Sequence, residues 1–157
     1  MSDVSSGSSW NAPVGASFST DGQRLFVWEK DGRVYVCNRQ GSGNYTKQST
    51  AVVNISDEVG GWRDFGLLGF ALDPNFASNG YIYLLYVVDR HYLMNFGTPA
   101  YSPTTSSTGA TIGRITRYKT ITSGSNLVTD LSSRMILLGE TKSTGIALTH
   151  DSHGLGT

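Results

Sequence analysis

Residues 66–76 read Gly-Leu-Leu-Gly-Phe-Ala-Leu-Asp-Pro-Asn-Phe. The stretch contains a short apolar run, an Asp-Pro pair and a closing aromatic residue. A short apolar run that is bounded by turn residues is typical of a buried β-strand. We therefore expect an inner strand that stops at Asp73-Pro74, because proline cannot donate a hydrogen bond to a strand ladder.

Turn signals and short alternating runs continue on both sides of this stretch. Asp21-Gly22 and Asp31-Gly32 flank runs of β-branched and aromatic residues, which is a strong signal for hairpins. Asn79-Gly80 precedes Tyr81–Val88, a run that is apolar at every position, so we expect a strand covered on both faces. Further strands are expected at residues 112–119 and 135–138, and no long window has a helical period.

The strands and turns occur in two similar copies, at about 14–55 and 66–138. A unit of about 40 residues with four strands is typical of a propeller blade. We expect a polar segment at 1–12 and an incomplete β-propeller at 13–157, with a third blade starting at about 144–157. A propeller normally closes with at least four blades, so we expect a piece of a longer protein. A small self-standing β-sheet protein remains the other interpretation.

An insertion at about 89–111 lengthens the second copy. It is rich in Gly, Pro, Ser and Thr, and a loop of this length is usually functional or disordered. The apolar residues near its start indicate that part of it packs against the protein: Tyr92, Leu93, Met94 and Phe96. We expect His91 and Tyr92 to be solvated rather than to form a lid.

Composition excludes several classes of protein. The formal net charge is zero and no basic cluster is present, which argues against nucleic-acid binding. Cys37 is the single cysteine, so neither an intrachain disulfide nor a cysteine-based metal site can form, and we expect a buried thiol. No signal peptide is visible, and no apolar run approaches the ~18 residues of a membrane span.

The opening stretch, followed by Asn79-Gly80-Tyr81-Ile82-Tyr83, resembles the blade signature of the soluble PQQ-dependent sugar dehydrogenases. That family includes the glucose and sorbosone dehydrogenases and the Hedgehog-interacting-protein propellers. Residues 18–36 are similar to the first blade of that family. Arg114–Tyr118 is similar to the end of the second blade, and His153–Gly156 is similar to the H-x-x-G that opens the third. The resemblance extends over most of residues 10–157.

The resemblance implies a six-bladed β-propeller that oxidises a sugar or polyol, with PQQ as hydride acceptor and Ca²⁺ holding the cofactor. It implies that His153 is the general base, and a neutral imidazole near pH 7 suits that role. It places Asp64 close to substrate or cofactor, and the neighbouring Trp62 is a candidate for stacking on a sugar. The alternative for Trp62 is a cover over the blade edge. An external electron acceptor and a periplasmic or secreted location are also implied.

The sequence departs from the family pattern at three places. Asp73 stands where many members have His, and we expect a structural role there. Asp64 stands where the glucose enzymes have Gln, which argues against specificity for glucose. Ser152 precedes the expected base, where that branch often has Asp. The groups that hold the PQQ carboxylates and calcium belong to later blades, so residues 1–157 alone are expected to be inactive.

Other candidate sites have weaker support. His150 and His153 lack further ligands, and Asp57 and Glu58 lack the spacing of a calcium loop, so we assign no metal ligand. No nucleophile elbow accompanies the Ser, His and Asp residues, which argues against a hydrolase. Arg114 and Arg117 lie three apart on one strand and therefore on opposite faces. The leading hypothesis is the dehydrogenase, and the alternative is a non-catalytic propeller that binds carbohydrate or a protein.

Overall fold

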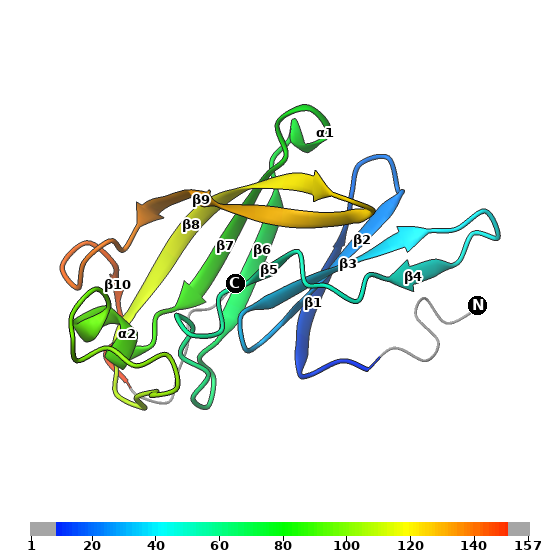
Figure 1. Ribbon diagram of the computed structural model, residues 1–157. Coiled ribbons are helices and arrows are strands. Elements are labelled where there is room, and N and C mark those ends of the chain that lie inside the picture. Colours follow the sequence, from blue (N-terminus) through cyan, green and yellow to red (C-terminus); the bar gives the residue numbers. More distant parts are fainter. Residues whose placement is uncertain (1–8, 151–157) are drawn as a thin grey trace.

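The computed structural model describes residues 9–150 and shows two antiparallel β-sheets (Figure 1). The first sheet has the order β1-β2-β3-β4 with β5 also paired to β3, and the second has the order β10-β8-β7-β6 with β9 also paired to β8. The strands of the first sheet are β1 (Pro13–Phe18), β2 (Arg24–Glu29), β3 (Arg33–Arg39), β4 (Tyr45–Lys47) and β5 (Val53–Asn54). Those of the second are β6 (Leu67–Leu72), β7 (Tyr81–Val87), β8 (Ile112–Ser123), β9 (Asn126–Leu138) and β10 (Ile146–Ala147). The predicted all-β fold class is confirmed.

The two sheets share one plan, in which the third strand pairs with two separate outer segments. In the first sheet β4 pairs with the end of β3 and β5 with its start, at Arg33 and Val34. In the second, β9 pairs with β8 from Ile115 onward and β10 with its start, at Ile112 and Gly113. Residues 146–147 of the expected third blade are therefore hydrogen-bonded to the second sheet. The position at which a third blade begins stays a prediction.

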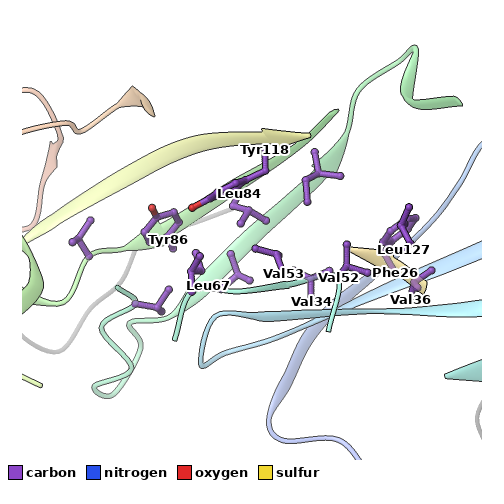
Figure 2. Close-up of a cluster of buried hydrophobic side chains, with 14 of the residues drawn as sticks. Phe26, Val34, Val36, Val52, Val53, Leu67, Leu84, Tyr86, Tyr118 and Leu127 are labelled. Carbon is purple, nitrogen blue, oxygen red and sulfur yellow. The ribbon is translucent and has the colours of Figure 1, made fainter. Parts of the chain in front are cut away.

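The hydrophobic core lies between the two sheets (Figure 2). Alternate residues of β7 point into it: Ile82, Leu84 and Tyr86 are fully buried, whereas Tyr81, Tyr83 and Leu85 are half-buried. In the described residues, β7 is thus fully covered on one face only, unlike the expectation from its apolar sequence. Residues of both sheets meet in this core: Phe26, Val34, Val36, Leu67, Leu84 and Tyr118.

Hydrogen bonds connect the sheets at both ends of the core. The Leu67 amide donates to the Lys30 carbonyl at 2.9 Å, where β1 and β6 lie against each other as edge strands. At the other end the buried Gln48 amide exchanges two bonds with the backbone of Leu127, at 2.8 and 2.9 Å. Satisfying a buried side-chain amide in this way fixes the relative position of the sheets.

The opening stretch forms β6 and the turn after it, as predicted. Asp73 ends the strand and accepts hydrogen bonds from the Asn75 amide, the Asn79 side chain and the Tyr83 hydroxyl. The hydrogen bond from Tyr83 first, and then those from Asn79 and Asn75, hold the pKa of Asp73 below its usual value. The helix α1 (Phe76–Asn79) follows and ends at Gly80. The contacts of Asp73 support the structural role expected for it.

Gly66 has less room for a side chain than Gly69, the other glycine of this stretch. Its φ is +148°, and an added Cβ would lie 2.6 Å from Lys30 Cγ and 2.8 Å from the Lys30 carbonyl oxygen. We expect Gly66→Ala to lower the free energy of unfolding by about 2–4 kcal/mol, measured by urea denaturation. Gly22→Ala is the matched control, because Gly22 has a φ of +66° with no atom within 4 Å. It should cost only ~1–2 kcal/mol, and equal costs would show that the contact with Lys30 is unimportant.

Two elements differ from their predicted extent. β9 begins at Asn126 rather than near Met135, because Gly124 allows a tight hairpin and long pairing with β8 stabilises the polar residues 126–134. The expected loop at 89–111 contains the helix α2 (Arg90–Asn95), which Asp89 caps through the amides of His91 and Tyr92. Within residues 9–150, no helix has the length and apolar character that a membrane crossing requires.

Candidate functional site

The loops between β2 and β3, between β5 and β6 and between β7 and β8 lie at one end of the sheets. The register places the start of β6 beside the end of β7, with Leu67 opposite Tyr86, and the end of β7 beside the start of β8. The Asp89 amide donates to the Glu58 carbonyl at 2.8 Å, which joins two of these loops. This loop end carries the sequence candidates Trp62 and Asp64.

Trp62, Arg63 and Asp64 form an exposed segment directly before buried Phe65. Trp62 is 41% exposed, which leaves indole surface open to solvent, and both the stacking role and the cover over the blade edge stay predictions. The Arg63 guanidinium lies 5.4 Å from the Trp62 ring centroid, and the Arg63 carbonyl accepts a hydrogen bond from the Lys30 ammonium. Arg63 has a left-handed φ of +45°, which is uncommon for a residue other than glycine. That Trp62 and Asp64 lie near a substrate or cofactor stays a prediction.

The insertion is the loop between β7 and β8, and its aromatic residues pack against one another and against the core. Tyr92 is buried, which corrects the expectation that it is solvated, and Leu93 contacts the core, whereas Met94 and Phe96 are exposed. The Tyr92 and Phe96 rings stack with centroids 4.5 Å apart. The second Asp89 carboxylate oxygen accepts from the Ser107 amide at 2.8 Å. Asp89 thus orders both the start and the later part of the insertion.

His91 and Asp57 also hold the insertion in place. His91 Nε2 accepts from the Ser102 amide at 3.1 Å, and the Tyr101 hydroxyl donates to Asp57 at 3.0 Å. The His91 ring stacks on Tyr101 with centroids 5.9 Å apart. His91 is therefore held by contacts within the insertion and is not simply solvated. The Asp57 carboxylate accepts a hydrogen bond from a tyrosine of the insertion.

A buried charged cluster beside the loop end was not predicted from the sequence. Glu58 Oε1 accepts from Arg114 Nη1 at 2.5 Å and from Arg134 Nη2 at 2.6 Å. The Tyr86 hydroxyl donates to the same oxygen and lies 2.9 Å from Thr116 Oγ1. Since two guanidiniums and a phenol already engage Glu58, its carboxylate is a poor candidate for calcium. Arg114 and Arg117 do point to opposite faces, with Arg117 lying 4.2 Å from the centroid of the Tyr81 ring.

Tyr86 of this cluster and Tyr118, which interacts with Glu58 and Arg134, make the stability of the fold depend on alkaline pH. Burial, then the nearby Glu58 charge, raises the pKa of Tyr118 to about 12, while burial and Glu58 raise that of Tyr86 well above its usual value. A raised folded-state pKa stabilises the fold fully below the unfolded value of about 10, and this contribution is lost as pH rises toward 12. Between pH 10 and 12, the free energy of unfolding of Tyr118→Phe should therefore fall by about 2 kcal/mol less than that of the parent protein. Identical slopes in urea melts across that range would contradict the assignment.

His153 and Ser152 lie outside the described residues, as does half of the predicted start of a third blade, residues 151–157. The structure describes the chain up to His150, and the Leu148 amide donates to the Thr111 carbonyl at 3.1 Å, at the loop end. Among residues 9–150, no three His, Cys, Asp or Glu side chains gather into a possible metal site. The role of His153 stays a prediction.

Comparison with known proteins agrees with this architecture. The sequence profile described as Glucose / Sorbosone dehydrogenase matches residues 10–144. The chain belongs to this family. Two solved structures described as glucose dehydrogenases superimpose on 82% and 80% of the chain, with TM-scores of 0.53 and 0.52 at 16% and 17% identity. At these identities the likeness shows the fold, and the two sheets are part of a propeller of the sugar dehydrogenase type.

A human protein is more similar in sequence over a shorter stretch. Hedgehog-interacting protein from Homo sapiens is 35% identical over 81 residues, which is 50% of this chain and 11% of that protein. The two glucose dehydrogenase structures are matched over 30% and 29% of their own length. The chain therefore spans less than a third of each of these relatives.

Proposed function

We propose that this chain forms part of a PQQ-dependent, calcium-assisted dehydrogenase of sugars or polyols. The observation that carries the proposal is the family match over residues 10–144, together with a propeller-type arrangement of two sheets. The family is named for oxidation of glucose and sorbosone, and the resemblance of the opening stretch to the PQQ-dependent enzymes supports the cofactor.

His153 is proposed as the general base. Oxidation of a C–OH carbon by hydride loss requires removal of the hydroxyl proton, and imidazole takes up a proton near neutral pH. PQQ, when bound, would supply the hydride acceptor. The calcium ligands are not assigned to the described residues, where no metal-ligating cluster is found, and no step is derived through the ion.

Trp62 and Asp64 are proposed to face the substrate. An exposed indole offers a flat apolar surface to the C–H face of a sugar ring, and a carboxylate beside it accepts hydrogen bonds from sugar hydroxyls. The two side chains are separated by one residue in the same exposed segment. Since Asp64 carries a charge where the glucose enzymes have an amide, we propose a sugar or polyol other than glucose as the preferred substrate.

An oxidised sugar requires an external electron acceptor to regenerate the cofactor. We propose such an acceptor, and a periplasmic or secreted location, from the resemblance to the PQQ-dependent enzymes.

Activity of the full-length protein tests the proposal. After reconstitution with PQQ and Ca²⁺, dye reduction is measured with a panel of aldoses and polyols, and residues 1–157 alone serve as a comparison expected to show no turnover. Folded full-length protein that oxidises none of the panel would refute the dehydrogenase function. A rate that does not depend on added PQQ would refute the cofactor alone.

Trp62→Ala tests the substrate-facing segment. We expect KM for the best substrate to rise roughly 2–10-fold with a smaller change in kcat, because stacking contributes to binding in both ground and transition states. Trp10→Phe is the control, since Trp10 packs on the first sheet against Tyr35 and Lys47. An unchanged KM in Trp62→Ala would place the sugar elsewhere.

A propeller that binds a carbohydrate or a protein without catalysis is the second candidate function. It is favoured by the 35% identity to Hedgehog-interacting protein over 81 residues, which exceeds the identity to the glucose dehydrogenase structures. The Asp64 departure supports the same reading. Saturable binding of a sugar without dye reduction, and without spectral change on PQQ addition, would favour this function over the enzyme.

A further inference from the structure

Lys30, directly after β2, joins three parts of the loop end. Its amide donates to the Ala12 carbonyl at 3.0 Å, beside the start of β1. Its carbonyl accepts from the Leu67 amide at 2.9 Å, at the start of β6. Its ammonium donates to the Arg63 carbonyl, in the middle of the exposed segment 62–64. The backbone of Lys30 thus connects β1 and β6, while its side chain reaches the segment proposed to face the substrate.

Backbone hydrogen bonds fix the chain on both sides of this exposed segment. Before it, the Gly60 amide donates to the Val87 carbonyl at 2.9 Å. After it, Phe65 is buried, and the Gly66 carbonyl accepts from the Val87 amide at 3.0 Å. The Phe65 amide also donates to the Trp62 carbonyl at 2.8 Å, which closes a turn. The two ends of the segment are therefore anchored on the second sheet.

The backbone between these anchors is strained at Arg63. Its left-handed φ of +45° is unfavourable for a residue with a Cβ and persists only where surrounding contacts maintain it. The Lys30 ammonium provides such a contact, because a charged donor forms a stronger hydrogen bond with a carbonyl than a neutral donor does. The stem of Lys30 is itself held in place, since Cγ would lie 2.6 Å from a Cβ added to Gly66. Lys30 is accordingly half-buried rather than free in solvent.

We propose that Lys30 is a positioning residue that holds Arg63 in its left-handed conformation and so fixes the directions in which Trp62 and Asp64 point. The inference rests on the proposed function, in which these two side chains face the sugar. Lys30 does not touch the substrate and acts through the Arg63 peptide. Because Lys30 belongs to the first sheet and the segment leads into the second, the contact between the two sheets sets the geometry of the substrate-facing segment.

Lys30→Met tests this role in the full-length protein with PQQ and Ca²⁺. Methionine keeps a stem that packs on Gly66 and leaves both backbone bonds of residue 30 in place, but it removes the ammonium. We expect KM for the best sugar to rise roughly 2–5-fold with kcat within about twofold of the parent value. In a Trp62→Ala background the same substitution should raise KM less, because residues that act through one another are not additive. Lys30→Arg keeps a charged donor and should return KM to within about twofold of the parent.

Fluorine NMR of the protein labelled with 5-fluorotryptophan follows the segment without any turnover. The resonances of Trp62 and Trp10 are assigned from their absence in Trp62→Phe and Trp10→Phe. Lys30→Met should shift or broaden the Trp62 resonance and leave that of Trp10 unchanged. Lys47→Met is the matched control and should do the reverse, since the Lys47 ammonium donates to the Ser9 carbonyl and lies 3.9 Å from the centroid of the Trp10 ring.

Three results would each overturn the positioning role of Lys30: an unchanged Trp62 resonance in Lys30→Met, an equal rise of KM in Lys47→Met, or fully additive effects of Lys30→Met and Trp62→Ala. A moved Trp62 resonance with an unchanged KM would overturn the role in substrate binding. If the full-length protein oxidises no sugar, the proposed function fails, and the fluorine spectra still decide whether Lys30 holds the segment.

Discussion

Glu58→Gln should lower the free energy of unfolding by about 3–5 kcal/mol, the largest stability change that we expect in this chain. Among residues 9–150, Glu58 is the single carboxylate that binds Arg114 and Arg134, and Arg114 is buried together with it. Removal of one member of a buried ion pair leaves the other charge without compensation in a medium of low dielectric constant. Urea denaturation monitored by fluorescence measures the change.

Glu140→Gln is the matched control for this variant. Glu140 is exposed and forms no ion pair among the described residues, so its change should stay within about 0.5 kcal/mol. If Glu58→Gln does not fold, the double variant Glu58→Leu with Arg114→Met should be more stable than Glu58→Leu alone, because it removes both charges. A cost below 1 kcal/mol for Glu58→Gln would show that water compensates the arginines.

His153→Gln should reduce kcat of the full-length protein with PQQ and Ca²⁺ by about 10²–10⁴-fold. Glutamine approximates the size of imidazole but cannot accept the substrate proton. The ascending limb of the pH profile of kcat/KM, expected near the ordinary histidine pKa of about 6.5, should vanish in the variant. Steady-state dye reduction across pH 5–9 provides both measurements.

His150→Gln serves as the control for His153, since it lies three positions away and no catalytic role is assigned to it. Its kcat should remain within a few-fold of the parent value. Retention of more than a tenth of the activity by His153→Gln, with the pH profile unchanged, would assign the base to another residue. Wild-type protein without any activity would instead direct attention to the binding function.

Local features of the sequence predicted much of the fold. The Asp-Gly and Asn-Gly turns and the run at 66–76 led to β1, β2, β3, β6 and β7, because hairpin turns and strand alternation depend on neighbouring residues. The family assignment came from the same stretch and is confirmed. The start of β9 was missed because residues 126–134 are mostly polar, and their pairing with β8 rather than their composition makes them a strand.

The candidate site was predicted less completely. The sequence pointed to Trp62 and Asp64 as neighbours on one loop, and the structure places both in an exposed segment at the loop end. The insertion was expected to pack in part, but the burial of Tyr92 depends on Asp89, which caps α2 and also accepts from Ser107, 18 residues away. Such a contact leaves no local periodicity in the sequence.

By itself, the sequence determined the strands, the turns and the family of this protein, since each depends on residues within a few positions of one another. The tertiary structure alone decided that Glu58 binds Arg114 and Arg134, which are 56 and 76 residues away, and that these arginines border a cavity under α2. The physical reason is that an exposed acidic residue and a buried ion-pair partner have the same sequence signal. Their difference in energy comes from desolvation and partner distance, which only the packed sheets establish.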